Sequence, residues 1–349
     1  MTLTIGILTG GGDCPGLNAA IQAVVRSGIS RGARVIGIHN GWQGLVDGDI
    51  KPLTEHSVSG IISWGGTILG TSRTDPVKTT AGFEAIKRTI ATSKIDALVV
   101  IGGDGTLRAA HEVALRGVPL VGIPKTIDND IAGTDVTIGF DTAVSIVTEA
   151  LDRLHTTAES HHRIMVVEVM GRNAGWIALT AGIAGGADAI LIPEVHMTMD
   201  ELCRNLKVRY DSGKKFSVVV VAEGTHHEDI TSSLVPVCDR DECGHEKFVG
   251  VGNVLGKDLE RRLAIETRVT TLGHVQRGGT PTAFDRVIAT RMGEFAVDQI
   301  YMKNFGCMIA VQGTRMTAVS LEEVVHRSKR VDPVLYEQAK RMMDGRISP

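Results

Sequence analysis

Short runs of β-branched residues alternate along the chain with longer segments of helical periodicity, and this alternation restricts the possible folds more than any other feature. Parallel strands need a crossover helix between them, so the alternation predicts an α/β fold with largely parallel sheets. The expected strands are residues 4–8, 34–38, 97–101, 120–123, 164–169, 189–192, 217–222 and 307–311. The expected helices are residues 17–30, 80–92, 106–116, 142–159, 200–211, 254–263 and 282–301.

Three of the expected strands run into a Gly-rich turn that is followed by a helix, at residues 7–16, 99–106 and 166–175. At such a turn the free backbone amides and the helix dipole favour an anion. In open α/β sheets, ligands bind at this edge, outside the carboxyl ends of the strands. The three turns therefore predict phosphate sites.

The chain has 349 residues, and a single hydrophobic core rarely accommodates so many. We therefore expect two lobes with a ligand cleft between them and a boundary near Phe140. The formal net charge of −3 gives no general attraction to nucleic acid or to an anionic membrane. No stretch predicts a membrane span, the N-terminus lacks the basic region of a secretion signal, and five cysteines fit reduced thiols. We therefore expect a cytoplasmic protein with neither nucleic acid nor membrane as a partner.

The first two Gly-rich turns carry different chemistry. Residues 10–13, Gly-Gly-Gly-Asp, match neither a Walker A loop nor a dinucleotide fingerprint, and either a tight structural turn or an anion loop explains them. In Gly102-Gly103-Asp104-Gly105-Thr106 an acidic side chain stands inside an anion cradle. A divalent cation would remove the repulsion between carboxylate and phosphate, so Asp104 is a magnesium candidate. The alternative is that Asp104 caps the helix expected to start near Thr106.

The segment Pro124-Lys125-Thr126-Ile127-Asp128-Asn129-Asp130 follows a buried strand and holds two carboxylates. If the segment is extended, Thr126, Asp128 and Asp130 face the same way. One carboxylate could then take a proton from an attacking hydroxyl while the other helps to hold a metal, as phosphoryl transfer requires. A solvated Asx turn is the alternative.

Basic side chains recur beside glycines or strand residues, and together they suggest a site for a doubly phosphorylated complex. They are Arg73, Arg163, Arg172, Arg268, His274 and Arg277. Any one of them could instead form a surface ion pair.

Cys238, Cys243 and His245, with His226 and His227 upstream, fit no standard zinc spacing and indicate a polar loop. The glycines at 250, 252 and 256 indicate helix packing.

The motifs GGGDCPGLNA, GGDGT, PKTIDND, EVMGR and GHVQRGG occur in this order between Gly10 and Gly279 and closely resemble those of the phosphofructokinase family. The resemblance implies two Rossmann-like three-layer lobes: residues 1–140 with about 278–325 for the phosphoryl donor, and residues 141–277 with about 326–349 for fructose 6-phosphate. It implies ATP-dependent phosphorylation of fructose 6-phosphate to fructose 1,6-bisphosphate in glycolysis, with Mg²⁺. The alternative is a diphosphate-dependent phosphotransferase.

The resemblance also implies roles for individual residues. Asp128 would be the catalytic base for the sugar's 1-hydroxyl, acting with Thr126 and Arg172, and Asp104 would be the magnesium ligand. The donor site would comprise Gly12, Arg73, Thr74, Gly103, Asp104, Gly105 and Thr106. The sugar-phosphate site would comprise Thr126, Ile127, Asp128, Arg163, Met170, Gly171, Arg172, Glu223, Arg268, His274, Val275, Gln276 and Arg277.

Family members share their active sites between subunits, Arg163 and Arg268 coming from a neighbour, so the resemblance implies a homodimer or homotetramer. The chain combines features of both donor classes, because Lys125 is typical of diphosphate-dependent members and Gly105 of ATP-dependent ones. In the family's effector pocket, Gln22 and His155 replace expected arginines while Arg26 is retained. This difference predicts weak regulation by ADP or phosphoenolpyruvate.

Overall fold

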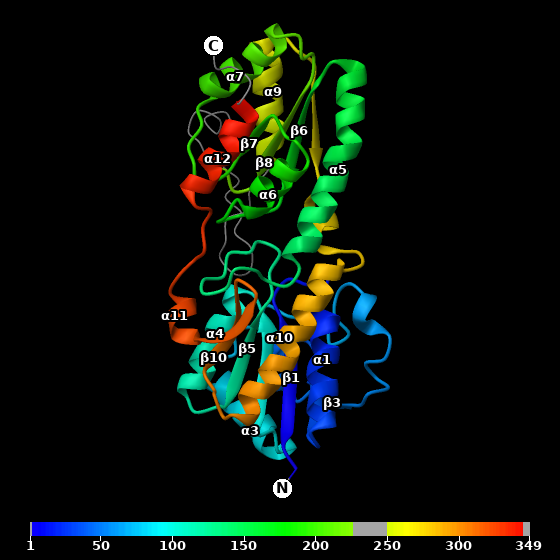
Figure 1. Cartoon of the computed structure of the whole chain (residues 1–349). Coiled ribbons are helices and arrows are strands. Elements are labelled where there is room, and N and C mark those ends of the chain that lie inside the picture. The colour runs from blue at the N-terminus through cyan, green and yellow to red at the C-terminus, as the bar shows by residue number, and fades with distance from the viewer. Residues whose placement is uncertain (1, 226–249, 345–349) are drawn as a thin grey trace. The chain divides into compact units, whose positions relative to one another are not determined.

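The computed structural model describes residues 2–225 and 250–344, which divide into two compact units. Unit 1 comprises residues 1–142 and 277–329, and unit 2 comprises residues 143–276 and 330–349. The boundary at residue 142 lies in the first turn of a long helix, α5 (Phe140–His161) (Figure 1).

Unit 1 is built on a mainly parallel sheet. Its elements are β1 (Thr4–Gly10), α1 (Leu17–Ser30), β2 (Arg34–Ile38), α2 (Trp42–Asp47), β3 (Ile50–Leu53), α3 (Thr80–Ser93), β4 (Ala97–Gly102), α4 (Asp104–Leu115), β5 (Leu120–Pro124), α10 (Ala283–Tyr301), β10 (Cys307–Gln312), β11 (Arg315–Ser320) and α11 (Leu321–Val325). Among the described residues the strand order is β11-β10-β5-β4-β1-β2-β3, and the two edge strands β3 and β11 pair antiparallel with their neighbours.

Helices cover both faces of this sheet. On one face, apolar side chains of β1, β2, β4 and β10 form a buried core with α2, α3, α4 and α11. On the other face α1 and α10 lie side by side, as Figure 1 shows in blue and orange. This three-layer arrangement explains why the central strands are apolar throughout rather than alternating.

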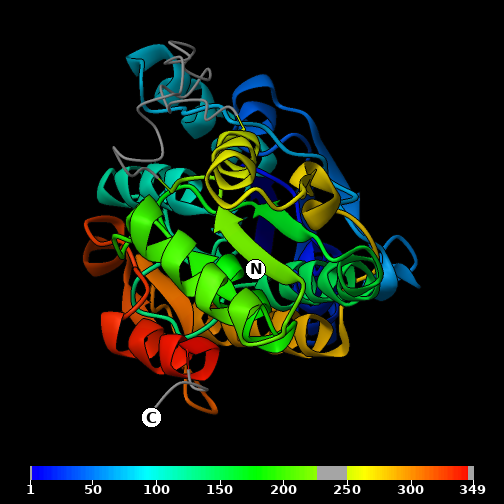
Figure 2. The same cartoon turned by 90° about the horizontal axis from the view of Figure 1, so that it is seen from above.

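Unit 2 contains a second, smaller sheet. Its elements after α5 are β6 (Ile164–Val169), α6 (Trp176–Ala184), β7 (Ala189–Leu191), α7 (Met199–Asp211), β8 (Ser217–Ala222), α9 (Val251–Leu263), β9 (Thr267–Thr271) and α12 (Pro333–Asp344). Within the described ranges the strand order is β7-β8-β6-β9 and all pairs are parallel. The side chains of α7 and α9 fill one buried core over this sheet, and α9 can be followed in yellow in Figure 2.

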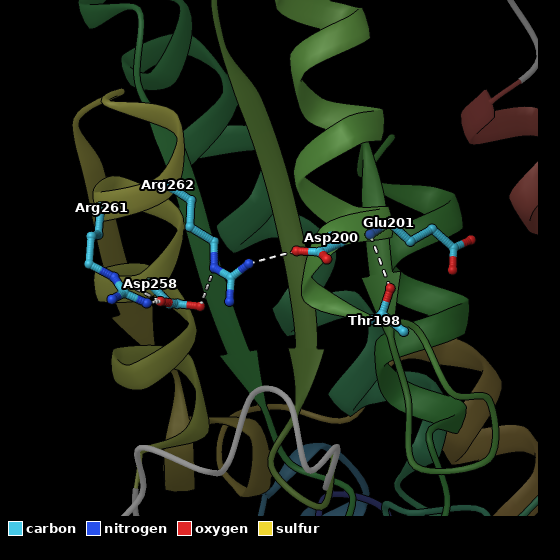
Figure 3. A network of polar contacts seen from close by, with 6 residues as sticks. All are labelled: Thr198, Asp200, Glu201, Asp258, Arg261 and Arg262. Atoms are coloured by element: carbon cyan, nitrogen blue, oxygen red, sulfur yellow. Dashed lines mark hydrogen bonds and ion pairs between the residues drawn. The ribbon is translucent and has the colours of Figure 1, made fainter.

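A polar network joins the two helices of that core at the surface of unit 2 (Figure 3). Arg262 of α9 donates through Nε to Asp258 at 2.8 Å and through Nη1 to Asp200 of α7 at 2.7 Å. Thr198 caps α7, its hydroxyl accepting from the Glu201 amide at 3.1 Å. The glycines of α9 serve packing as expected, since a Cβ at Gly252 or Gly256 would meet Glu168 or Val269 side chains.

The expected α/β fold is confirmed, and all expected strands and helices are present. The sequence interpretation missed β3, β9 and β11 and the helices α2, α6, α11 and α12. Helix α6, WIALTAGIA, shows no amphipathic period because it is apolar almost all round. Strand β9 is polar and half exposed, which hides the usual strand pattern. In the described residues, no helix combines the length and the apolar character needed to cross a membrane.

Asp285 ties the start of α5 to the start of α10. Its carboxylate is fully buried and accepts from the Gly139 amide at 2.9 Å, the Thr142 amide at 2.8 Å and the Thr142 hydroxyl at 2.5 Å. In return, Asp141 of α5 accepts from the hydroxyl of Thr282, the N-cap of α10, at 2.6 Å. Each helix thus supplies an acceptor to the other's first turn.

We expect Asp285→Ala to destabilise the protein by about 3 kcal/mol, because three buried donors would lose their acceptor. Urea unfolding measures the loss. Asp152, exposed on α5, offers a matched control, and Asp152→Asn should change stability by less than about 0.5 kcal/mol. Equal unfolding midpoints for the Asp285 variant and the control would contradict the role given to Asp285.

Candidate active site

Three neighbouring strands of unit 1 end at the same level of the sheet. Gly10 at the end of β1 pairs with Gly102 at the end of β4, and Gly102 pairs with Pro124 at the end of β5. The three loops that carry the predicted donor and base residues therefore leave one edge of the sheet side by side. The strand ends, rather than sequence proximity, bring these residues together.

The Gly10–Asp13 loop is bound from several sides. The Gly11 amide donates to the Ser72 carbonyl at 2.9 Å, and the Thr71 hydroxyl donates to the Gly11 carbonyl at 2.5 Å. These bonds bring the following residues, the exposed Arg73 and the half-buried Thr74, to the same loop. The guanidinium of Arg277 packs so closely against Gly12 that a Cβ there would collide with it. A side chain at position 12 would force the guanidinium of Arg277 to move, and residues 71–74 lie beside the same loop.

Asp104 occupies the first turn of α4, which starts two residues earlier than expected, with Gly103 as its N-cap residue. The alternative that Asp104 is the cap is therefore wrong. Its carboxylate pairs with Arg108 at 2.8 Å and is about half exposed. A Cβ added at the next residue, Gly105, would have no neighbour within 4 Å, so glycine there is not required by packing. The start of α4 thus presents a carboxylate next to open space.

The segment after β5 turns instead of running extended, which corrects the expected alternation of Thr126, Asp128 and Asp130. The Asp128 amide donates to the Thr126 hydroxyl at 3.2 Å, and Asn129 has φ 51°. The solvated Asx turn is also wrong, because a threonine closes the turn and Ile127 is fully buried. Both aspartates are half-buried in this turn.

A second segment, which the sequence interpretation missed, supports this turn. The Thr137 hydroxyl donates to the Thr126 carbonyl at 2.7 Å, and the Asn129 side chain donates to the Asp135 carbonyl at 3.3 Å. On the other side the Lys329 amide donates to the Asp130 carbonyl at 2.8 Å. No local pattern could reveal Lys329, which comes about 200 residues later in the chain.

The carboxylates of Asp104 and Asp128 act on that of Asp130. Burial first, and then the negative charges of Asp128 and Asp104, raise the pKa of Asp130 to about 7. Such a concentration of negative charge favours a divalent cation. Among residues 2–225 and 250–344 no group of three or more His, Cys, Asp or Glu side chains forms a complete metal site. Mg²⁺ commonly takes only one or two carboxylates and completes its shell with phosphate oxygens and water, which Asp104 fits.

In unit 2 the ends of β8, β6 and β9 are also neighbours. Met170, Gly171 and Arg172 follow β6, Glu223 follows β8, and His274, Val275 and Gln276 follow β9. Arg172 Nε lies 3.7 Å from Glu223 Oε1, and the buried Gln276 side chain accepts from the Met170 amide at 3.2 Å. Gly171 has φ 129°, a conformation that favours glycine. Unit 2 thus brings together most of the predicted sugar-phosphate residues.

Arg163 and Arg268 lie at the opposite, amino-terminal end of β6 and β9, around Glu266. Arg163 Nε is 2.6 Å from Glu266 Oε2, and Arg268 Nη2 pairs with Glu266 Oε1. The Arg163 hydrogen bond is the main cause that lowers the pKa of Glu266. Within one chain, both arginines therefore form the ion pairs that were the alternative to phosphate binding. Both pair with the same carboxylate, that of Glu266.

Two further expectations concern an effector pocket and a group of Cys and His side chains. A cavity of about 650 Å³ in unit 1 is lined by Gln22, Arg26, Arg31, Glu55 and Glu294 among others, so arginines and glutamates balance there. The Gln22 amide is bonded to the Val58 carbonyl at 2.5 Å, and in unit 2 the His155 ring is 2.7 Å from the Gly185 carbonyl. Weak binding of phosphorylated effectors stays a prediction. The Cys and His residues at 226, 227, 238, 243 and 245, whose spacing fits no standard zinc site, lie outside the described residues.

Comparison with known proteins gives matches over almost the whole chain. Residues 4–300 match the family model described as Phosphofructokinase. A pyrophosphate–fructose 6-phosphate 1-phosphotransferase of Streptomyces coelicolor is 51% identical, over 96% of this chain and 98% of its own. An enzyme of the same organism named ATP-dependent 6-phosphofructokinase 3 is 49% identical, over 97% of this chain and 99% of its own.

Solved structures agree with this assignment. Phosphofructokinase from Pichia pastoris matches with a TM-score of 0.82 and 34% identity, covering 99% of this chain, which spans 37% of the length of that one. The pyrophosphate-dependent phosphofructokinase of Marinobacter aquaeolei, at 20% identity, matches in fold with a TM-score of 0.83, over 98% of this chain and 91% of its own. From the motifs, the fold and these matches together, it follows that the chain belongs to the phosphofructokinase family.

Proposed function

We propose that this protein transfers the γ-phosphoryl group of ATP to the 1-hydroxyl of fructose 6-phosphate, producing fructose 1,6-bisphosphate and ADP in glycolysis. The observation that carries the choice of ATP is the open space at Gly105. ATP must pass its α-phosphate and nucleoside by the Gly102–Thr106 loop, and a side chain at Gly105 would stand in that path. The structure has no packing reason of its own for a glycine there, so a bulky donor explains it.

The chemistry divides among the residues already described. The Asp128 carboxylate accepts the proton of the sugar hydroxyl as its oxygen attacks the γ-phosphorus and ADP leaves. Asp104 would hold Mg²⁺, which neutralises charge on the donor phosphates when it is bound. Arg73 and Thr74 with the Gly10–Asp13 loop bind the donor. Arg172 stabilises charge that develops on the transferred group, and the remaining unit 2 residues bind the sugar phosphate.

A diphosphate-dependent reaction is the second candidate, and two observations favour it. Lys125 occupies the position where diphosphate-dependent members of the family carry lysine. The Streptomyces coelicolor relative that is 51% identical carries a diphosphate-dependent name, so identity alone does not separate the donors. Under this alternative the same base, Asp128, would act on the same hydroxyl.

A steady-state assay with Mg²⁺ and saturating fructose 6-phosphate tests the choice. We expect kcat/KM with ATP to exceed kcat/KM with diphosphate at least tenfold, since the open path at Gly105 serves only the larger donor. Product identification as fructose 1,6-bisphosphate checks the acceptor. Faster turnover with diphosphate would assign the protein to the second candidate.

We further propose that the enzyme is a cytoplasmic homodimer or homotetramer in which Arg163 and Arg268 reach the sugar phosphate of a neighbouring subunit. Their shared position around Glu266 supports a joint role. Arg163→Ser should then raise the KM for fructose 6-phosphate about 10- to 100-fold, because a charge-assisted hydrogen bond to phosphate is lost. Activity should fall when the protein is diluted to monomers. Full activity of a monomer in ultracentrifugation coupled to an assay would refute shared sites.

A further inference from the structure

Lys125 directly follows the last residue of β5, at the start of one of the three loops, yet it is only 2% exposed. Its Nζ donates to the carbonyl oxygen of Gly10 at 3.0 Å and to that of Gly12. Its own amide donates to the Gly102 carbonyl at 3.0 Å. One residue therefore binds the ends of both other strands: its backbone bonds to β4, the neighbour of β5, and its side chain reaches β1, the next strand in the sheet.

Burying an ammonium group is costly unless its donors are satisfied. Burial is the main cause that lowers the pKa of Lys125, and nearby Cys14, Asp13 and Asp128 act in the opposite direction. Two of the three N–H donors of the ammonium meet backbone carbonyls of the Gly-rich loop. The side chain is thus committed to the loop rather than extended toward open space.

The loop itself needs such a tether. A run of three glycines has more conformational freedom than any other tripeptide, so its backbone keeps one phosphate-binding conformation only if other groups hold it. Thr71 and Ser72 hold Gly11 from one side, and Lys125 holds Gly10 and Gly12. Together these contacts fix the loop in one conformation.

We propose that Lys125 is a positioning residue that holds the Gly10–Gly12 turn in its phosphate-binding conformation for any phosphoryl donor, rather than the residue that selects diphosphate. The proposal rests on the proposed function in one respect, namely that this turn binds the donor. It removes the conflict between the two donor signals, because a lysine bonded to the loop is compatible with ATP.

The test compares Lys125→Met, which keeps an unbranched side chain of nearly the same length and removes its charge and donors, with Thr71→Val. Thr71→Val removes another tether of the same turn without changing any charge, and so it is the matched control. We expect Lys125→Met to weaken the binding of ATP and of diphosphate by the same factor, about tenfold or more, since the hydrogen bonds of a charged ammonium group are lost. Diphosphate is measured by its KM, or by its Ki against ATP where it is not turned over. The KM for fructose 6-phosphate should stay within about twofold. Thr71→Val should also weaken the binding of both ATP and diphosphate.

Hydrogen exchange of the backbone amides supplies a readout that does not need activity. In Lys125→Met the peptide covering residues 8–14 should exchange faster, while the peptide covering residues 97–101 should not change. Weakened diphosphate binding with unchanged ATP kinetics, or unchanged exchange at residues 8–14, would overturn the proposal. If the unmutated protein phosphorylates fructose 6-phosphate with neither donor, the proposed function fails, and the exchange result still decides the role of Lys125.

Discussion

Replacing Asp128 by asparagine should lower kcat about 10²- to 10⁴-fold, the usual contribution of a positioned general base. Asparagine keeps the size of the side chain and the turn that Thr126 closes, but it cannot accept the proton of the sugar hydroxyl. The KM for fructose 6-phosphate should change by no more than a few-fold, because the variant removes an interaction made in the transition state. Steady-state kinetics at saturating ATP measure both constants.

Asp49 provides the control for the loss of one negative charge. It is exposed in unit 1 just before β3 and belongs to none of the three loops, and Asp49→Asn should leave kcat and KM unchanged. Thermal unfolding of both variants checks that they are folded. An Asp128→Asn enzyme with the kcat of the unmutated protein would remove Asp128 from the mechanism.

The parts of the fold that follow from local pattern could be predicted. Each of the three Gly-rich turns lies between a strand and a helix as expected, because apolar β-branched runs and glycines are local signals. The order of the strands brings the motifs of each unit to one edge of its sheet. The α/β class predicts that ligands bind at such an edge, but it does not predict which strands are neighbours. Three strands run one or two residues beyond their expected ends, since β1 ends at Gly10, β4 at Gly102 and β5 at Pro124.

Other features depend on contacts between distant residues. The sequence of segment 126–130 allows either an extended strand or an Asx turn, whereas Asn129 adopts a left-handed conformation and Thr137 holds the turn from outside. Arg277, whose place in the sugar-phosphate site stays a prediction, lies against Gly12 in unit 1. The bond from Lys125 to Gly10 spans 115 residues. No sequence period reports such contacts, so only the structure could separate a lysine that binds the loop from one that binds a ligand.

Replacing Gly105 by aspartate should abolish most ATP-dependent activity, lowering kcat/KM for ATP by about 10²-fold or more. The carboxylate would enter the open space that we assign to the donor and would add a negative charge near Asp104 and the phosphates. The repulsion between the new carboxylate and the donor phosphates, and the loss of space for the donor, each cost on the order of 1–3 kcal/mol in a confined site. Kinetics with ATP and with diphosphate measure the change, and the diphosphate activity should fall less than the ATP activity.

Gly105→Ala separates the effect of space from that of charge. Gly105 lies in the first turn of α4 and its Cβ would meet nothing, so alanine should stabilise the protein by up to about 1 kcal/mol through its higher helix propensity. The KM for ATP should rise only a few-fold, since a methyl group fills little of the path. A graded loss from glycine to alanine to aspartate, with folding intact, is what an occupied donor path requires. If Gly105→Asp retained its ATP activity, the donor would have to pass elsewhere, and the choice of ATP over diphosphate would lose its structural basis.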